Sequence, residues 1–257
     1  MRTRLASAIA RRYGAAIDPP AGLVPLDALA ALNERSVCRR YRSDPVPEAL
    51  FQLLCATALA APTKSDLQQA TIIRVADPAK RAAIASLLPG SPWLAGAPEL
   101  LVFCADGWRF RRLFEKRKAR FVNEHLDAFF NATVDTAIVL GTFVAAAELA
   151  GLGSCPISQI RDHVAKLDAL LGLPDWVIPV AGLALGYPAT KEPMSARLSL
   201  SATVHTDRYD TAAVERELDA YDARRGKDWS GDKVKQYSTV WRADFGDFVR
   251  CKRFRLE

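Results

Sequence analysis

The 257-residue chain is half hydrophobic by composition and carries a formal net charge of +6. Such a chain can bury a substantial core and lies near the upper size of one domain, so we expect one domain with arms. The basic residues are spread along the sequence, without zinc-finger spacing, an aromatic RNA-binding signature or a basic-leucine pattern. We therefore expect anionic small ligands and no nucleic-acid partner, and a basic nucleic-acid-binding domain is the least favoured alternative.

The cysteines indicate a reducing compartment and no metal site. Cys38, Cys55, Cys104, Cys155 and Cys251 are far apart, form no C-x-x-C pair and lie at no metal-ligand spacing from a histidine. We expect reduced thiols in a cytoplasmic protein.

Two segments superficially resemble targeting or membrane sequences. Residues 1–16 are rich in Arg and Ala, but they lack the long apolar core of a secretory signal, so an exposed amphipathic helix is the preferred interpretation. Residues 132–152 are the most apolar longer segment, yet they carry Asp135 and Glu148 in a span barely long enough to cross a bilayer. We expect a buried helix and no membrane span.

The predicted elements alternate between helix and strand after an N-terminal arm, residues 1–25, which is set apart by three prolines. Apolar periodicity predicts helices, and β-branched or apolar runs of strand length predict core strands. The helices are expected at 26–33, from about 48 to before Pro62, at 80–88, over 122–150 as one helix or a broken pair, and at 162–171; the strands are expected at 71–75, 100–104 and 177–185. Because no regular βαβ repeat emerges, the fold class is predicted as α+β.

Two helical regions leave alternatives open. The helix over 134–150 is apolar on most sides and contains Gly141, so it is the central helix of the domain, part of a subunit interface, or both. Beyond His205 the chain is charged helix with many large aromatic side chains. That segment either packs on its own domain or forms an arm over a partner subunit.

Three polar segments suit a phosphorylated planar ligand. Arg35 and Ser36, with Arg39 close behind, offer forked hydrogen bonds and charge for a phosphate. Residues 61–69 form a polar loop, and residues 151–159 follow the apolar helix with two glycines and lack the full Rossmann pattern. Taken singly, these segments have ordinary interpretations as a solvated arginine face, a surface loop and a helix C-cap.

In this order, the three segments resemble the nitroreductase family. Its members show an R-x-S-x-R-like motif, then a P-S/T-x-x-N-x-Q-like loop, and later G-L-G-x-x-x-I; here these correspond to residues 35–39, 62–68 and 151–157. Residues 183–188 resemble the family's last core strand, 195–198 its K-x-R-L element, and 228–230 the C-terminal extension of its NADPH-using branch. The resemblance implies a central, mainly antiparallel sheet flanked by helices in an intertwined homodimer. It also implies an FMN-binding domain over 26–205 and a C-terminal helical extension over 206–257 that packs on the dimer.

The resemblance assigns roles to individual residues. Arg35 and Ser36 would hold the FMN phosphate, and Arg39 would lie near the ribityl chain or the pyrimidine edge, where positive charge favours the reduced flavin. The remaining candidates would line or contact the ring (Thr63, Lys64 and Gln68, from either subunit), offer backbone groups near flavin N5 (Ser158 and Gln159), or bind a phosphate of FMN or NADPH (Arg161 and Arg197).

Three positions depart from the family pattern. Cys38 is an extra residue between Ser36 and Arg39, so Arg40 competes for the role of Arg39. Asp66 stands where the family commonly has Asn, which exchanges a donor and acceptor for an acceptor alone. Ser195 replaces the lysine that usually precedes Arg197.

The function implied by the resemblance is FMN-dependent NAD(P)H oxidation by a ping-pong mechanism, in which NADPH, or NADH, reduces flavin N5 and a small-molecule acceptor then takes the electrons. Nitroaromatics, quinones and free flavins are the expected acceptors, and the loop over 106–121 would shape their pocket. No side chain acts as a nucleophile, and no metal is expected. The alternative is a flavin-binding protein with little turnover, used for storage or sensing.

Overall fold

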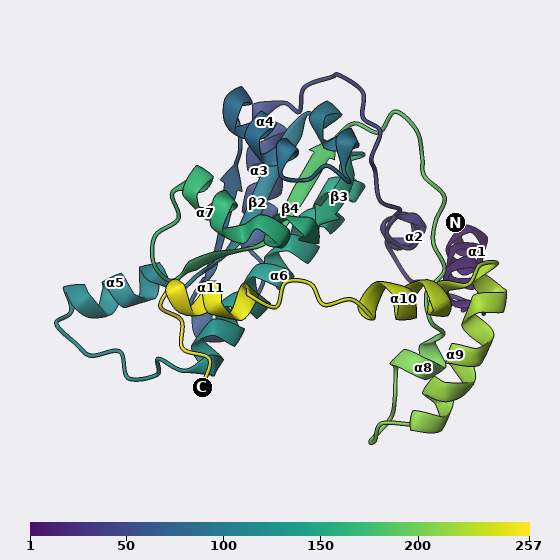
Figure 1. Cartoon of the computed structure of the whole chain (residues 1–257). Helices are drawn as coiled ribbons and strands as arrows, with labels where there is room; N and C mark the ends of the chain where they lie inside the picture. Colours follow the sequence, from purple (N-terminus) through teal and green to yellow (C-terminus); the bar gives the residue numbers. More distant parts are fainter. The chain divides into compact units, whose positions relative to one another are not determined.

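The computed structural model covers residues 1–257, whose elements fall into two units (Figure 1). The first unit, Met1–Ser36 with Glu192–Val240, is helical. The second, Val37–Lys191 with Trp241–Glu257, contains the sheet. Sheet and helices do not alternate as βαβ repeats, so the predicted α+β class is confirmed.

The sheet of the second unit is antiparallel throughout, with strand order β1-β2-β4-β3. Its strands are β1 (Ala70–Arg74), β2 (Glu99–Asp106), β3 (Gly153–Ile157) and β4 (Val177–Gly186). The two central strands are buried along nearly their whole length. Burial on both faces explains why they appear in the sequence as continuous apolar runs instead of alternating ones.

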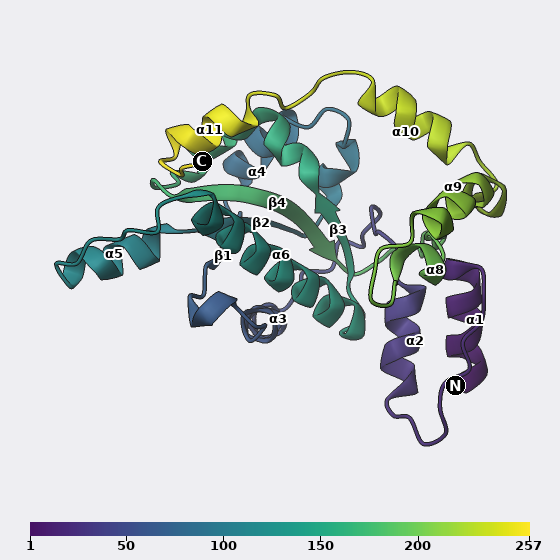
Figure 2. The ribbon, with the colours of Figure 1, turned by 90° about the horizontal axis from the view of Figure 1, so that it is seen from below.

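Helices cover both faces of this sheet (Figure 2). On one face, Leu101 and Phe103 of β2 pack against α3 (Glu48–Leu59) and α6 (Leu126–Leu149), and the ring of Phe103 meets that of Phe143 edge-on at 5.6 Å. On the other face, Leu100 and Val102 pack against α4 (Pro78–Ser86) and α7 (Val164–Leu171). Successive residues of β2 therefore serve opposite layers of the core.

Short elements complete the second unit. They are the helix α5 (Trp108–Lys116), the C-terminal helix α11 (Phe245–Cys251), and the 3-10 helices η1 (Lys64–Asp66), η2 (Pro92–Gly96) and η3 (Ser158–His163). The C-terminal segment is tied to its own unit, because the Lys252 ammonium donates to Asp168 Oδ1 at 3.0 Å and to the Leu173 carbonyl at 2.7 Å.

The helix α6 is long and apolar enough to suit a membrane span, with 28% of its most apolar window buried. It packs on α3 and on the sheet. The helix predicted over 122–150 is thus present as one helix and not a broken pair, and it begins at Leu126 instead of near residue 122. His125 marks its start, since its side chain accepts from the Asp127 N–H.

The first unit consists of α1 (Arg2–Tyr13), α2 (Leu26–Glu34), α8 (Leu200–Thr203), α9 (Thr211–Arg225) and α10 (Trp229–Tyr237). The helix α1 confirms the helix expected at the N-terminus. It buries Leu5, Ala8 and Arg12, and it ends at Gly14 in the left-handed conformation, with φ of +87°. A side chain at Gly14 would be strained, and its Cβ would lie 2.8 Å from Arg224 Cδ of α9.

The strand β3 was not predicted, because residues 151–159 have the composition of a polar loop. Its sequence contains Gly, Ser and Pro, which are poor strand formers. The strand lies at the edge of the sheet, where Pro156 is tolerated although it lacks an N–H group. Pairing with β4 overrides the local preference here.

Candidate functional site

In the first unit, Arg12 brings together two of the predicted phosphate-binding segments. Its guanidinium donates to the Asn33 carbonyl at 2.7 Å, to the Arg35 carbonyl at 2.6 Å and to the Ser195 carbonyl at 3.4 Å. The backbone N–H of Arg197 donates to the Arg12 carbonyl at 2.6 Å. The segments of Arg35 and Arg197 are consequently held next to the buried Arg12. These three residues form what we call the arginine cluster.

The electrostatics of this arginine cluster favour an anion. Burial lowers the pKa of Arg12, as do the neighbouring charges of Arg197 and Arg35. Arg35 is half-buried and Arg197 is exposed, so both are within reach of a ligand. The Arg35 side chain donates to the Ser36 carbonyl at 3.3 Å, and the Arg197 side chain donates to Ser195 Oγ at 2.6 Å. A phosphate would offset the mutual repulsion of these guanidiniums.

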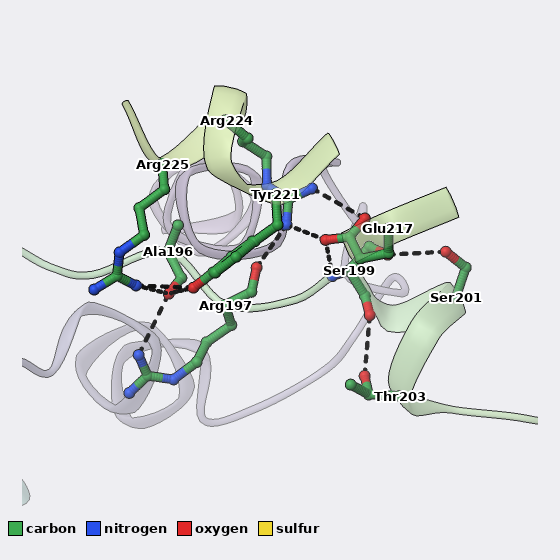
Figure 3. Close-up of polar contacts among 9 residues, drawn as sticks. All are labelled: Ala196, Arg197, Ser199, Ser201, Thr203, Glu217, Tyr221, Arg224 and Arg225. Atoms are coloured by element: carbon green, nitrogen blue, oxygen red, sulfur yellow. Dashed lines mark hydrogen bonds and ion pairs between the residues drawn. The ribbon is translucent and has the colours of Figure 1, made fainter. Parts of the chain in front are cut away.

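The segment that carries Arg197 is fixed by the helix α9 (Figure 3). The Tyr221 hydroxyl donates to the Ala196 carbonyl at 2.9 Å, and the Arg224 guanidinium donates to the Arg197 carbonyl at 2.7 Å. Glu217 accepts from the Ser199 N–H at 2.8 Å and forms an ion pair with Arg224. This pair is the largest cause of the lowered pKa of Glu217.

In the second unit, the predicted residues Arg39, Ser158 and Gln159 line one cavity of about 420 Å³. Trp93 lies in the same wall, with its ring 5.9 Å from the Arg39 guanidinium carbon. Ser91 Oγ donates to Gln159 Oε1 at 2.9 Å, which fixes the amide of Gln159. The cavity thus combines a cation, a large aromatic face and oriented polar groups.

The extra residue Cys38 is accommodated by the sheet. Its N–H donates to the Ser154 carbonyl at 3.0 Å, and its side chain lies against Gly153 of β3. Its carbonyl accepts from the Tyr41 hydroxyl at 2.6 Å. Burial raises the pKa of that hydroxyl, so Tyr41 stays neutral. With Cys38 anchored in this way, Arg39 lines the cavity, and Arg40 is not among the lining residues.

The polar loop with Thr63, Lys64 and Gln68 is anchored on a buried carboxylate. Asp135 of α6 accepts from the Lys64 N–H at 2.9 Å and from the Gln69 N–H at 3.4 Å. Gln68 has a φ of +51°. Its N–H donates to Thr63 Oγ1 at 3.2 Å. The Lys64 and Gln68 side chains are exposed, and the structure places this loop outside the set of residues that line the cavity.

Arg161 is not among the residues that line the cavity. Its guanidinium donates to the Val180 carbonyl and lies 6.0 Å from the Phe245 ring centroid. Burial and the nearby charge of Arg242 lower its pKa. Its assignment to a phosphate stays a prediction.

Three residues of these sites were missed from the sequence. Arg12 lies in a segment that was interpreted as an exposed arm. Trp93 belongs to η2, a segment with no resemblance to a family motif. Asp135 carried a signal, because an acidic residue in an apolar helix requires a buried partner.

The fold and these sites define an α+β protein with an arginine cluster suited to a phosphate. The model of the Nitroreductase family matches residues 32–187. The FMN reductase [NAD(P)H] of Bacillus subtilis is 29% identical over 247 residues, covering 90% of this chain and 99% of the relative. The oxygen-insensitive NADPH nitroreductase of Salmonella typhimurium is 32% identical over 206 residues, covering 78% of this chain and 84% of the relative.

Comparison with solved structures indicates the same fold. The hypothetical oxidoreductase YcnD from Bacillus subtilis superposes with a TM-score of 0.85 at 28% identity, covering 90% of this chain and 99% of that chain. The chain belongs to the nitroreductase family.

Proposed function

We propose that this protein is an FMN-dependent NAD(P)H oxidoreductase that reduces small acceptors such as nitroaromatics, quinones or flavins. The observation that carries the proposal is the arginine cluster at Arg35 and Arg197, found on segments that resemble the family's R-x-S-x-R and K-x-R-L elements. The relatives named FMN reductase and NADPH nitroreductase support the same cofactor pair.

The residues of the first unit fit the phosphate of FMN. Arg35 and Arg197 supply charge, and the Ser36 hydroxyl supplies a further donor. The cluster gains stability from a dianion, because Arg12 adds a third positive charge that the surrounding carbonyls do not neutralise.

The residues of the second unit fit a planar, electron-accepting ring. FMN, when bound, supplies the group that accepts a hydride from NAD(P)H at N5 and passes reducing equivalents to the acceptor. Arg39 places positive charge where the reduced ring system would be negative. The backbone at Ser158 and Gln159 would orient the ring edge, and Trp93 would exclude water from one side of the cavity.

A second copy of the chain would complete the site. Leu126, Phe130, Val134 and Ile138 recur every four residues along α6, so they share one face. Their exposed fractions are 48%, 59%, 37% and 37%. Covering this apolar face in a homodimer accounts for it without a bilayer, and it would bring the loop of Thr63, Lys64 and Gln68 to an interface. We propose a cytoplasmic homodimer.

Anaerobic reduction tests the enzymatic function. Protein loaded with FMN should lose its absorbance near 450 nm when NADPH is added, and it should recover this absorbance when a quinone is added. A protein that binds FMN and is not bleached by NADPH or NADH supports the alternative of a flavin-binding protein with little turnover. The same titration with NADH compares the two nicotinamide donors.

A further inference from the structure

The N-terminal helix α1 supplies an arginine to the arginine cluster from outside the family motif. The family model begins at residue 32, whereas Arg12 lies in the last turn of α1. Arg12 is only 6% exposed, although it is a charged residue on a short surface helix. A buried guanidinium has to be matched by hydrogen bonds, and this one forms them with carbonyls of the two segments that carry Arg35 and Arg197.

The contacts of Arg12 join two segments that are distant in the chain. Its Nε and Nη2 atoms bind the Asn33 and Arg35 carbonyls, at the end of α2. Its Nη1 atom binds the Ser195 carbonyl. A guanidinium has five N–H donors in a rigid planar fork, so it fixes both segments in one geometry; a lysine ammonium presents a single flexible point.

The backbone of Arg12 adds a second connection. Its carbonyl accepts from the Arg197 N–H at 2.6 Å, so the side chain and the main chain of one residue hold both flanks of the cluster. Burial and the neighbouring charges of Arg197 and Arg35 lower the pKa of Arg12, so an anion bound beside these arginines would stabilise the cluster.

We propose that Arg12 is a positioning residue for the FMN phosphate, which aligns Arg35 and Arg197 by binding the carbonyls of their segments. The inference rests on the proposed binding of FMN at these residues. It adds that α1, a segment outside the family model, sets the affinity for the phosphate group without touching the flavin ring.

Binding of FMN compared with riboflavin tests this role, because riboflavin has the same ring and lacks the phosphate. Dissociation constants would be measured by flavin fluorescence for the wild type, Arg12→Gln, Arg12→Lys and Arg11→Gln. Arg11 is the control, since it lies beside Arg12 on α1 with its side chain 64% exposed, and its ion pair with Glu34 Oε1 is long at 3.9 Å. Far-ultraviolet circular dichroism verifies the fold of each variant.

Arg12→Gln is expected to weaken FMN binding by roughly tenfold or more, with riboflavin affinity changed by less than about twofold. Arg12→Lys should fall between Arg12→Gln and the wild type, and Arg11→Gln should match the wild type. Equal losses for both ligands, or no loss for either, would overturn the positioning role. If Arg12→Gln does not fold, Arg12→Lys decides, with a selective loss of FMN affinity supporting the role and an unchanged ratio contradicting it.

The failure of the underlying function would look different. A wild type that binds FMN no better than riboflavin would contradict the phosphate site itself. If the wild type prefers FMN to riboflavin and Arg12→Gln keeps the same preference, only the role of Arg12 is contradicted.

Discussion

A methyl group at Gly153 would collide with Cys38. A Cβ at this position would lie 2.6 Å from both Cβ and Sγ of Cys38, where β3 pairs with the segment that leads to Arg39. We expect Gly153→Ala to lower the free energy of unfolding by about 1–3 kcal/mol, because the buried side chain of Cys38 would have to shift to relieve the overlap. Gly96→Ala is the control, since no atom lies within 4 Å of its Cβ, and urea unfolding should show a change below about 0.5 kcal/mol.

Arg39, and not Arg40, is expected to tune the flavin. Arg39 lines the cavity beside Trp93, so its loss removes positive charge that would stabilise the reduced ring. Arg39→Ala should lower the two-electron reduction potential by roughly 30 mV, equivalent to a tenfold change in the redox equilibrium. Arg40→Ala should shift it much less. A larger effect for Arg40 in a dye-equilibration titration would reverse the assignment.

Family motifs led to candidate residues from the sequence, whereas long-range contacts gave no local signal. Arg39, Ser158 and Gln159 line one cavity, and their roles at the flavin stay a prediction. The role of Arg12 could not be predicted, because an arginine in an amphipathic helix has the same local pattern whether its partners are water or distant carbonyls. Its partner Ser195 lies 183 residues away.

At the scale of elements, α9 helps to fix the Arg197 segment through the Glu217 carboxylate. The stability that this carboxylate contributes depends on pH. The ion pair with Arg224 lowers the folded-state pKa of Glu217 below the ordinary value of 4.5. Because the folded-state pKa is lowered, the ionised carboxylate stabilises the fold at every pH above the unfolded-state pKa. This stabilisation is lost as the pH falls through the folded-state pKa.

We therefore expect Glu217→Gln to be less stable than the wild type at pH 7, with the difference in Tm shrinking below about pH 4.5. Thermal unfolding followed by circular dichroism at several pH values measures it. Asp219, on the same helix and exposed, is a suitable position for the control Asp219→Asn. A difference that is constant with pH would contradict the role of this carboxylate.

The exposed apolar face of α6 leads to a prediction about the oligomeric state. Ile138→Glu places a charge among apolar side chains that a second copy would bury, so the variant should become a monomer. Leu113→Glu on α5, with a leucine 47% exposed, is the control that should keep the wild-type state. Light scattering during size-exclusion chromatography distinguishes them, and an unchanged Ile138→Glu assembly would remove this face from the interface.

Elements with strong patterns were predicted, and elements that depend on pairing were not. Three strands were apparent from their apolar runs, and in β2 and β4 burial on both faces leaves a continuous hydrophobic signal. The long helix was apparent from its composition, although one of its apolar faces is exposed. The edge strand β3 was missed because its residues favour a loop until β4 pairs with them.

At the scale of the whole molecule, the sequence predicts the family but not the division into units. Ser36 ends the first unit and Val37 begins the second, so the boundary falls inside a family motif where composition gives no signal. Residues 192–240 join the N-terminal segment through contacts with α1, such as that of Arg197 with Arg12. The domain limits expected from the sequence, 26–205 and 206–257, stay a prediction for the dimer.

The central claim is that this chain binds FMN through its phosphate and its ring. Isothermal titration of cofactor-free protein with FMN tests it most directly. The account predicts saturable binding of one FMN per chain, with a Kd well below that for riboflavin. Absence of heat and of fluorescence quenching at FMN concentrations up to the millimolar range would contradict it.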